Sequence, residues 1–131
     1  AIEEGVMPRT SKNELELIDH GIVEVATAEL DGITADYLTI KAPVDMSEML
    51  KGLPDDRCQC PHWGIVTKGS MTVTYGDRPD EVAKAGDTFH MTPGHRPAYE
   101  VGTEIVQFSP TDQLKATDEA IQRNMARLQG A

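Results

Sequence analysis

The sequence predicts one all-β domain, an antiparallel sandwich or barrel, followed by a single C-terminal α-helix. A chain of 131 residues is expected to fold around one core. Short runs of β-branched and aromatic residues, separated by turn residues, recur along residues 15–108, which is typical of antiparallel sheets. The spacing of apolar residues then changes from alternation to a helical period over residues 109–131.

The N-terminal part of the chain divides into an arm and a first group of strands. Residues 1–14 are polar and aperiodic, so we expect a flexible N-terminal arm there. Strands are predicted over residues 15–40, where His-Gly and Asp-Gly pairs favour tight turns. An acidic N-cap candidate at Asp45 and a glycine at position 52 predict one or two helical turns between them.

The centre of the chain carries the clearest strand signal. Met71, Val73 and Tyr75 alternate with threonines, so one face of this strand is expected to be buried. Short strands of the same kind continue to the end of the barrel at residue 108. We expect the aromatic side chains of these strands to fill the core: Tyr37, Tyr75, Phe89, Tyr99 and Phe108.

The last 23 residues, 109–131, are predicted to form the C-terminal helix. Ser109 and Pro110 are suited to an N-cap and a first turn, and one apolar stripe follows, formed by Leu114, Ile121, Met125 and Leu128. The stripe must be covered, either by the outside of the barrel or by a second subunit. A homodimer, formed through this helix or through the N-terminal arm, is therefore one interpretation.

Charge and composition exclude several classes of partner. Asp and Glu outnumber Lys and Arg by 22 to 12, and the net charge of −10 repels nucleic acid and anionic membrane surfaces. No run of 18 apolar residues exists, and the first residues lack the pattern of a secretion signal. We therefore expect a cytoplasmic protein. The two cysteines, one residue apart, are too close for an unstrained disulfide, so a disulfide framework is not expected.

Four residues with metal-binding chemistry form the candidate site: Cys58, Cys60, His62 and His95. If residues 58–62 are extended, their alternate side chains project to one face, which would bring two sulfurs and an imidazole together. Thiolate and imidazole ligands favour Zn²⁺, with Fe²⁺ as the other candidate, over Mg²⁺ or Ca²⁺. The alternative is structural: the cysteines act as small apolar fillers, and backbone groups satisfy the histidines.

Two further residues are secondary cavity candidates. Trp63 follows the first histidine and either lines a cavity or fills the barrel core, which is the more common role of a single tryptophan. His90 lies between Phe89 and Met91, so alternation places it on the opposite face, as a ligand or as a solvent-exposed side chain.

Two segments, 62–71 and 85–95, resemble the two motifs of the cupin superfamily, and the match is best from Gly86 to Gly94. The resemblance covers residues 33–108 and implies a small double-stranded β-helix barrel, similar to a jelly roll. In that family, three histidines and a glutamate hold a metal inside the barrel.

The first motif departs from the family pattern here. Aligned on Gly69, the chain has His62 in place of the glutamate and Cys58 in place of the second histidine. Aligned on the His-x-His pair, it has Cys60 and His62 in place of the two histidines.

Three functions remain open at this point. The first is a metal-dependent enzyme acting on a small molecule, an isomerase, lyase or dioxygenase of the cupin type. In it Cys60, His62 and His95, with Cys58 optional, hold a metal that keeps a free coordination position. The second is a structural or sensing module in which Cys58, Cys60, His62 and His95 together saturate the metal. The third is a metal-free barrel that binds an apolar or acidic metabolite through Trp63, Met91 and Arg96. For the first and third functions, the expected partner is a small-molecule substrate or ligand.

Overall fold

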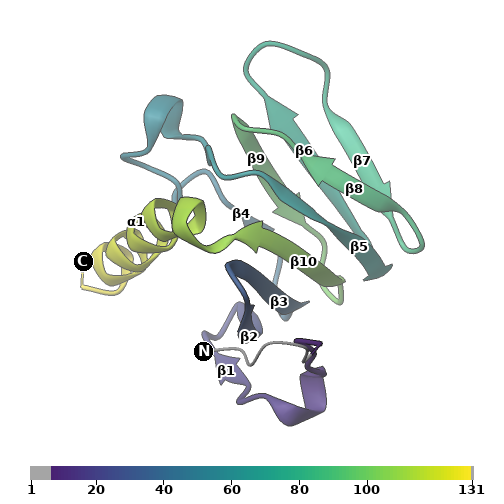
Figure 1. The fold of residues 1–131 in the computed structure, drawn as a ribbon. Helices are drawn as coiled ribbons and strands as arrows, with labels where there is room; N and C mark the ends of the chain where they lie inside the picture. Colours follow the sequence, from purple (N-terminus) through teal and green to yellow (C-terminus); the bar gives the residue numbers. More distant parts are fainter. Residues whose placement is uncertain (1–6, 131) are drawn as a thin grey trace.

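The computed structural model describes residues 7–130, which form two antiparallel sheets and one long helix (Figure 1). The strands are β1 (Ile18–Asp19), β2 (Val23–Leu30), β3 (Ile33–Ile40), β4 (Val44–Asp45), β5 (His62–Lys68), β6 (Ser70–Tyr75), β7 (Glu81–Lys84), β8 (Thr88–Met91), β9 (His95–Tyr99) and β10 (Glu104–Pro110). The helix α1 spans Thr111–Gln129, and two short 3-10 turns, Lys12–Glu14 and Pro54–Asp56, lie in loops.

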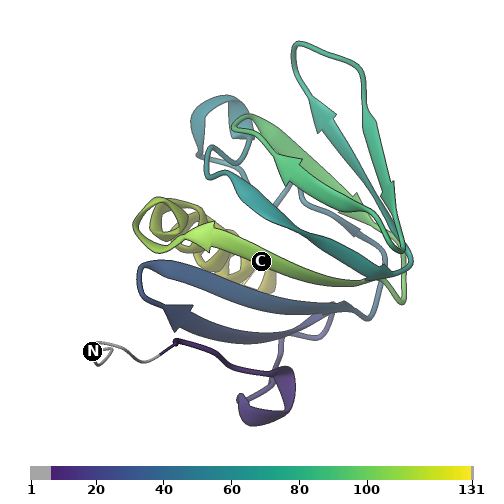
Figure 2. The same cartoon turned by 45° about the vertical axis from the view of Figure 1, so that its right-hand side comes forward.

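The two sheets pack face to face around one core. The six-stranded sheet has the order β1-β2-β3-β10-β5-β8, and the four-stranded sheet has the order β4-β9-β6-β7. Figure 2 shows β2, β3, β10 and β5 side by side in the larger sheet. Both sheets contribute buried side chains to the core cluster, which comprises Val66, Met71, Val73, Met91 and Ile105. The all-β architecture with one C-terminal helix is confirmed.

The turn between β5 and β6 depends on a glycine. Gly69 has φ +76°, a left-handed conformation that costs other residues energy. A Cβ at this position would also lie 2.8 Å from the Cα of Thr103, on the neighbouring turn. The Thr103 hydroxyl donates to the carbonyl of Ser70 at 3.0 Å and accepts from its amide at 3.1 Å. This close approach holds the β5–β6 turn against the start of β10.

Helix α1 packs against its own chain through one side. Leu114, Thr117, Ala120 and Asn124 are buried, whereas Leu128 is 41% exposed. Of the predicted apolar stripe, Leu114 is buried and Ile121 and Met125 are half-buried, so the same chain covers the stripe in part. A homodimer, through this helix or through the N-terminal arm, stays a prediction.

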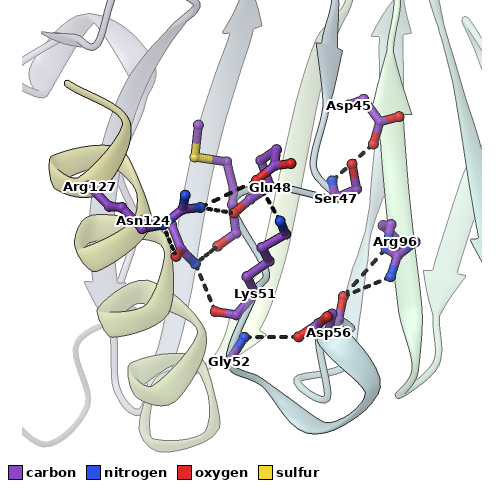
Figure 3. A network of polar contacts seen from close by, with 10 residues as sticks. Asp45, Ser47, Glu48, Lys51, Gly52, Asp56, Arg96, Asn124 and Arg127 are labelled. Carbon is purple, nitrogen blue, oxygen red and sulfur yellow. Dashed lines mark hydrogen bonds and ion pairs between the residues drawn. The ribbon is translucent and has the colours of Figure 1, made fainter. Parts of the chain in front are cut away.

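Asn124 joins the helix to the irregular segment 46–53 that precedes the second 3-10 turn (Figure 3). Its side-chain amide donates to the carbonyls of Met49 and Lys51, both at 2.8 Å, and Arg127 pairs with Glu48 at 3.3 Å. Residues 46–52 form consecutive turns, and the Leu50 amide donates to the Met46 carbonyl at 3.0 Å, the hydrogen bond of a single α-helical turn. The helix side chain satisfies two carbonyls of these turns.

Several local predictions need correction. Ser109 is not an N-cap: it belongs to β10, and α1 begins at Thr111 after Pro110. Tyr37, Trp63 and Phe108 were expected in the core, but strand alternation turns all three to the outer face of the larger sheet, where Trp63 is 44% and Phe108 39% exposed. No helix among residues 7–130 is long and apolar enough to span a membrane.

The predicted N-terminal arm falls partly outside the described residues. Residues 1–6 are not described. Among the following residues, Lys12 donates to the Thr39 hydroxyl at 3.2 Å and lies 3.8 Å from a Glu104 carboxylate oxygen. The part of the arm around residue 12 therefore contacts the larger sheet.

Removing the Asn124 amide tests the docking of the helix. Asn124→Ala removes two partly buried hydrogen bonds, each worth about 0.5–1.5 kcal/mol, and is expected to lower the free energy of unfolding by about 1–3 kcal/mol. Urea unfolding measures this change. Lys115→Ala, on the exposed side of the same helix, is the control and should change stability by less than about 0.5 kcal/mol. Equal stability of the Asn124 variant and wild type would contradict this account of the docking.

Candidate metal centre

One thiol and two imidazoles converge inside the barrel. Ligand atoms of Cys58, His62 and His95 all lie within 4.8 Å of one another, and all three residues are buried. The Cys58 Sγ atom is 3.5 Å from His62 Nε2. The ring centroids of the two histidines are 4.8 Å apart in an edge-to-face arrangement. Within residues 7–130, this is the cluster whose atoms could share one metal ion.

Backbone pairing brings the three residues together from separate elements. His62 begins β5 and His95 begins β9, which belong to different sheets. Cys58 precedes β5 and forms an isolated antiparallel bridge with His95. The Cys58 amide donates to the His95 carbonyl at 3.0 Å, and the Gly94 amide donates to the Cys58 carbonyl at 2.8 Å. The bridge thus places the thiol beside both imidazoles.

Neighbouring polar groups orient the three side chains. His95 Nδ1 donates to the Thr92 carbonyl at 2.7 Å, so its Nε2 carries the free lone pair. His62 Nδ1 is hydrogen-bonded to the Ser109 hydroxyl at 2.7 Å, and its Nε2 faces the thiol. The Thr117 hydroxyl of α1 lies 3.2 Å from Cys58 Sγ. A partner on the second ring nitrogen is the usual way in which metal-binding histidines are held in place.

One pair of donors in the cluster has the separation that a tetrahedral transition-metal ion requires. Bond lengths of about 2.3 Å to sulfur and 2.1 Å to nitrogen require a sulfur–nitrogen separation of about 3.6 Å. The observed Cys58–His62 separation of 3.5 Å agrees with this value. Three protein ligands leave a fourth position for water or another molecule, as catalytic zinc sites do.

The fourth predicted ligand, Cys60, lies outside the cluster. It is buried beside Leu50 and Leu114, and its Sγ contacts the Pro61 carbonyl at 3.4 Å. The chain bends at Cys60, so residues 58–62 are not one extended strand. The two-residue alternation is interrupted at Cys60. Of Cys58, Cys60 and His62, only Cys58 and His62 lie beside the imidazole of His95.

The two secondary candidates lie on the outer face of the larger sheet. Trp63 and His90 are directly paired across β5 and β8, and their rings stack with centroids 4.5 Å apart. His62, the neighbour of Trp63, faces inward because alternate residues of a strand point to opposite faces. Trp63 is therefore not a wall of the barrel cavity. The Arg96 guanidinium donates to the Asp56 carbonyl and does not line the cavity either.

Burial keeps both histidines neutral and the thiol protonated. Burial, together with the nearby His95, lowers the pKa of His62 to about 3, and burial also lowers the pKa of His95. Burial raises the pKa of Cys58 and raises that of Cys60 to about 12. Neutral imidazole is the form that binds metal, and a bound cation deprotonates a coordinating thiol. The site is thus suited to a cation that supplies the missing positive charge.

A cavity of about 300 Å³ adjoins the cluster. Its walls are mostly apolar and come from β2, β3 and α1, among other elements. Among the polar side chains that also line it are three that the sequence analysis did not name: Asp36, Gln107 and Asp118. Strand alternation would have placed Asp36 on the same face as Leu38 and Ile40, and this was the available signal.

Solved structures share this architecture, although no protein-family model and no curated protein matches the sequence. A mutant of Bacillus subtilis oxalate decarboxylase OxdC superposes with a TM-score of 0.58 at 14% identity, covering 82% of this chain and 31% of its own. An RmlC-like cupin from Shewanella frigidimarina gives a TM-score of 0.55 at 17% identity, covering 80% of this chain and 95% of its own. The chain has the cupin fold. The iron(II) form of HppE also matches, with a TM-score of 0.54 at 12% identity, over 83% of this chain and 62% of its own.

In this cupin barrel, the two sequence motifs meet at one end. The first motif, residues 62–71, forms β5 and the start of β6, whereas the second, 85–95, forms β8 and the turn into β9. Because β5 pairs with β8 with His62 opposite Met91, the turn after β8 returns His95 to the neighbourhood of His62. This chain spans less than a third of the OxdC chain, so the likeness concerns one barrel.

The depressed histidine pKa values predict acid sensitivity of the metal-free protein. His62 binds a proton in the unfolded state below about pH 6.5 but stays neutral in the folded state until about pH 3. Its contribution to stability is present above pH 6.5 and is lost as the pH falls. Between pH 7 and pH 5 the loss is expected to be about 2 kcal/mol.

Urea unfolding at pH 7 and pH 5, in the presence of a chelator, measures this loss in wild type and in His62→Gln. Asp118, whose pKa burial raises to about 6, acts in the opposite direction, so the difference between the two proteins is the relevant quantity. The variant should show the smaller acid loss. His20→Gln, at an exposed turn, is the control and should behave as wild type. An unchanged pH dependence in His62→Gln would show that His62 does not titrate in this way.

Proposed function

We propose that this protein binds a divalent transition metal, Zn²⁺ or alternatively Fe²⁺, through Cys58, His62 and His95, and uses it to bind or transform a small molecule. The observation that supports this proposal is the convergence of one thiol and two oriented imidazoles beside a cavity. Buried polar groups are normally hydrogen-bonded within the protein. His95 uses Nδ1 for such a bond, and its other ring nitrogen belongs to the cluster. A metal ion would satisfy these atoms.

The metal would act as a Lewis acid that polarises an oxygen atom of the bound molecule. The protein's own residues provide the setting. Ser109 and Thr92 orient the imidazoles, and Thr117 contacts the thiol from the helix. The apolar walls from β2, β3 and α1 provide a surface against which the body of a small molecule can pack.

Proton exchange at the cavity wall is available to one carboxyl group. Burial raises the pKa of Asp118 to about 6, so this group changes protonation state close to neutral pH. A lyase or isomerase reaction needs such a group, whereas a binding or sensing protein does not. We propose a small-molecule partner in both cases, as the substrate of an enzyme or as the ligand of a binding or sensing protein.

Metal content measured by elemental analysis tests the proposal, on protein purified without a metal-affinity column. We expect about one ion per chain and a lower thermal midpoint after chelation, because the ion binds only the folded state. Cys58→Ser should release most of the metal. Cys60→Ser is the matched control, since it alters a second buried cysteine two positions away, and it should keep the metal.

The other outcomes separate the competing functions. Equal metal loss in both cysteine variants would indicate a closed site with four protein ligands, as in a structural or sensing module. A chain that takes up neither Zn²⁺ nor Fe²⁺ when these are added in excess would contradict the proposal and leave a metal-free ligand-binding barrel.

A further inference from the structure

A group of hydrogen-bond acceptors lines the cavity on strands that hold none of the three metal-binding candidates. Asp36 of β3 and Gln107 of β10 are directly opposite each other in the antiparallel pairing, so their side chains lie on the same inward face. Asp118 of α1 lines the same cavity. Sheet and helix thus contribute two carboxyl groups and one amide oxygen to one space.

The Gln107 side chain has an unused acceptor. The residue is only 7% exposed, and its Oε1 atom has no hydrogen-bond partner among the described residues. Burying an acceptor without a donor destabilises the fold, so a native protein keeps such an acceptor where a bound molecule supplies the donor. Asp36 is partly satisfied, since the Thr27 hydroxyl donates to its Oδ1 at 2.6 Å. No hydrogen bond to its Oδ2 is formed within residues 7–130.

The same wall lacks a positive charge. Among residues 7–130, no Lys or Arg side chain lines the cavity, and neither Asp36 nor Asp118 forms an ion pair. Burial raises the pKa of both carboxyl groups, and the charge of Asp36 adds to the increase at Asp118. Each carboxylate is thus without a counter-ion inside the protein. An anionic molecule would meet only repulsion at this wall.

Most of the remaining wall is apolar. It includes Val25, Leu38, Ile40, Ile121 and Met125. Such a surface favours a hydrocarbon body by removing it from water.

We infer that the cavity binds a small molecule with an apolar body and a primary ammonium group, which donates hydrogen bonds to Asp36 and Gln107. This inference rests on the proposed function, because it names the class of molecule that the same cavity takes. An ammonium group carries three donors and a positive charge, so it satisfies both the orphan amide oxygen and the uncompensated carboxylates. A hydroxyl group offers one donor and leaves the charge unbalanced.

The test is an NMR titration of ¹⁵N-labelled, chelator-treated protein with hexylammonium, 1-hexanol and hexanoate. Removing metal prevents the free amine from binding as a metal ligand. The three probes share one alkyl chain and differ in the head group, so their affinities report on the polar wall. Hexylammonium should bind about tenfold or more tightly than hexanol, with hexanoate weakest. The largest shifts should fall on residues of β3 and β10 around Asp36 and Gln107.

Two variants locate the preference. Asp36→Asn keeps the shape of the side chain and should reduce the ammonium-over-alcohol preference to about twofold or less. Asp118→Asn, at a helix position that lines the cavity and is partly open to solvent, should reduce it partly and provides the test if the first variant does not fold. Asp80→Asn, an exposed loop position outside the cavity, is the matched control and should keep the preference.

The outcomes distinguish this inference from the proposed function. If hexanol binds as tightly as hexylammonium, or if Asp36→Asn and Asp118→Asn both keep the preference, the inference is wrong even when the protein binds metal. If the protein takes up no metal but still prefers hexylammonium through Asp36, the inference holds and the metal proposal fails. Metal content of Asp36→Asn, measured in parallel on metal-loaded protein, should equal that of wild type.

Discussion

The bridge between Cys58 and His95 is the contact on which the candidate site depends. Two backbone hydrogen bonds, of 3.0 and 2.8 Å, join an irregular segment before β5 to the turn that leads into β9. Without them the thiol would belong to a loop and the imidazole to a sheet, with nothing to fix their separation. The bridge also brings Cys58 under helix α1, where Thr117 reaches its sulfur.

Several features that look separate serve this arrangement. Asn124 ties the helix to the carbonyls of Met49 and Lys51, and so holds the segment that leads to Cys58. The cluster beside it, which includes Leu50, Cys60 and Leu114, packs the same segment against the helix. The helix thus lines one side of the cavity and helps to position Cys58, one of the three metal-binding candidates. This explains why a chain with the cupin fold carries a C-terminal helix across its barrel.

Much of the architecture could be predicted because alternation in strands is a local property. Met71, Val73 and Tyr75 indicated a half-buried strand, and the structure places Met71 and Val73 in the core. Trp63 and Phe108 are exposed although aromatic side chains are usually buried, because strand alternation points both outward. His62 is buried, so its neighbour Trp63 had to face the other side.

Cys60 could not be placed from spacing, since the bend at that residue depends on contacts with distant Leu50 and Leu114. Gln107 and Ser109 acquire their importance only from register across the sheet, which a sequence does not display.

X-ray absorption at the metal edge of the metal-loaded protein tests the central claim most directly. The account predicts one sulfur at about 2.3 Å, two imidazole nitrogens at about 2.0–2.1 Å, and a further light atom from water or another ligand. Cys58→Ser should remove the sulfur contribution, and Cys60→Ser should leave it unchanged. Two sulfur ligands in the wild type, or a sulfur signal that disappears with Cys60 rather than Cys58, would contradict the site described by the geometry.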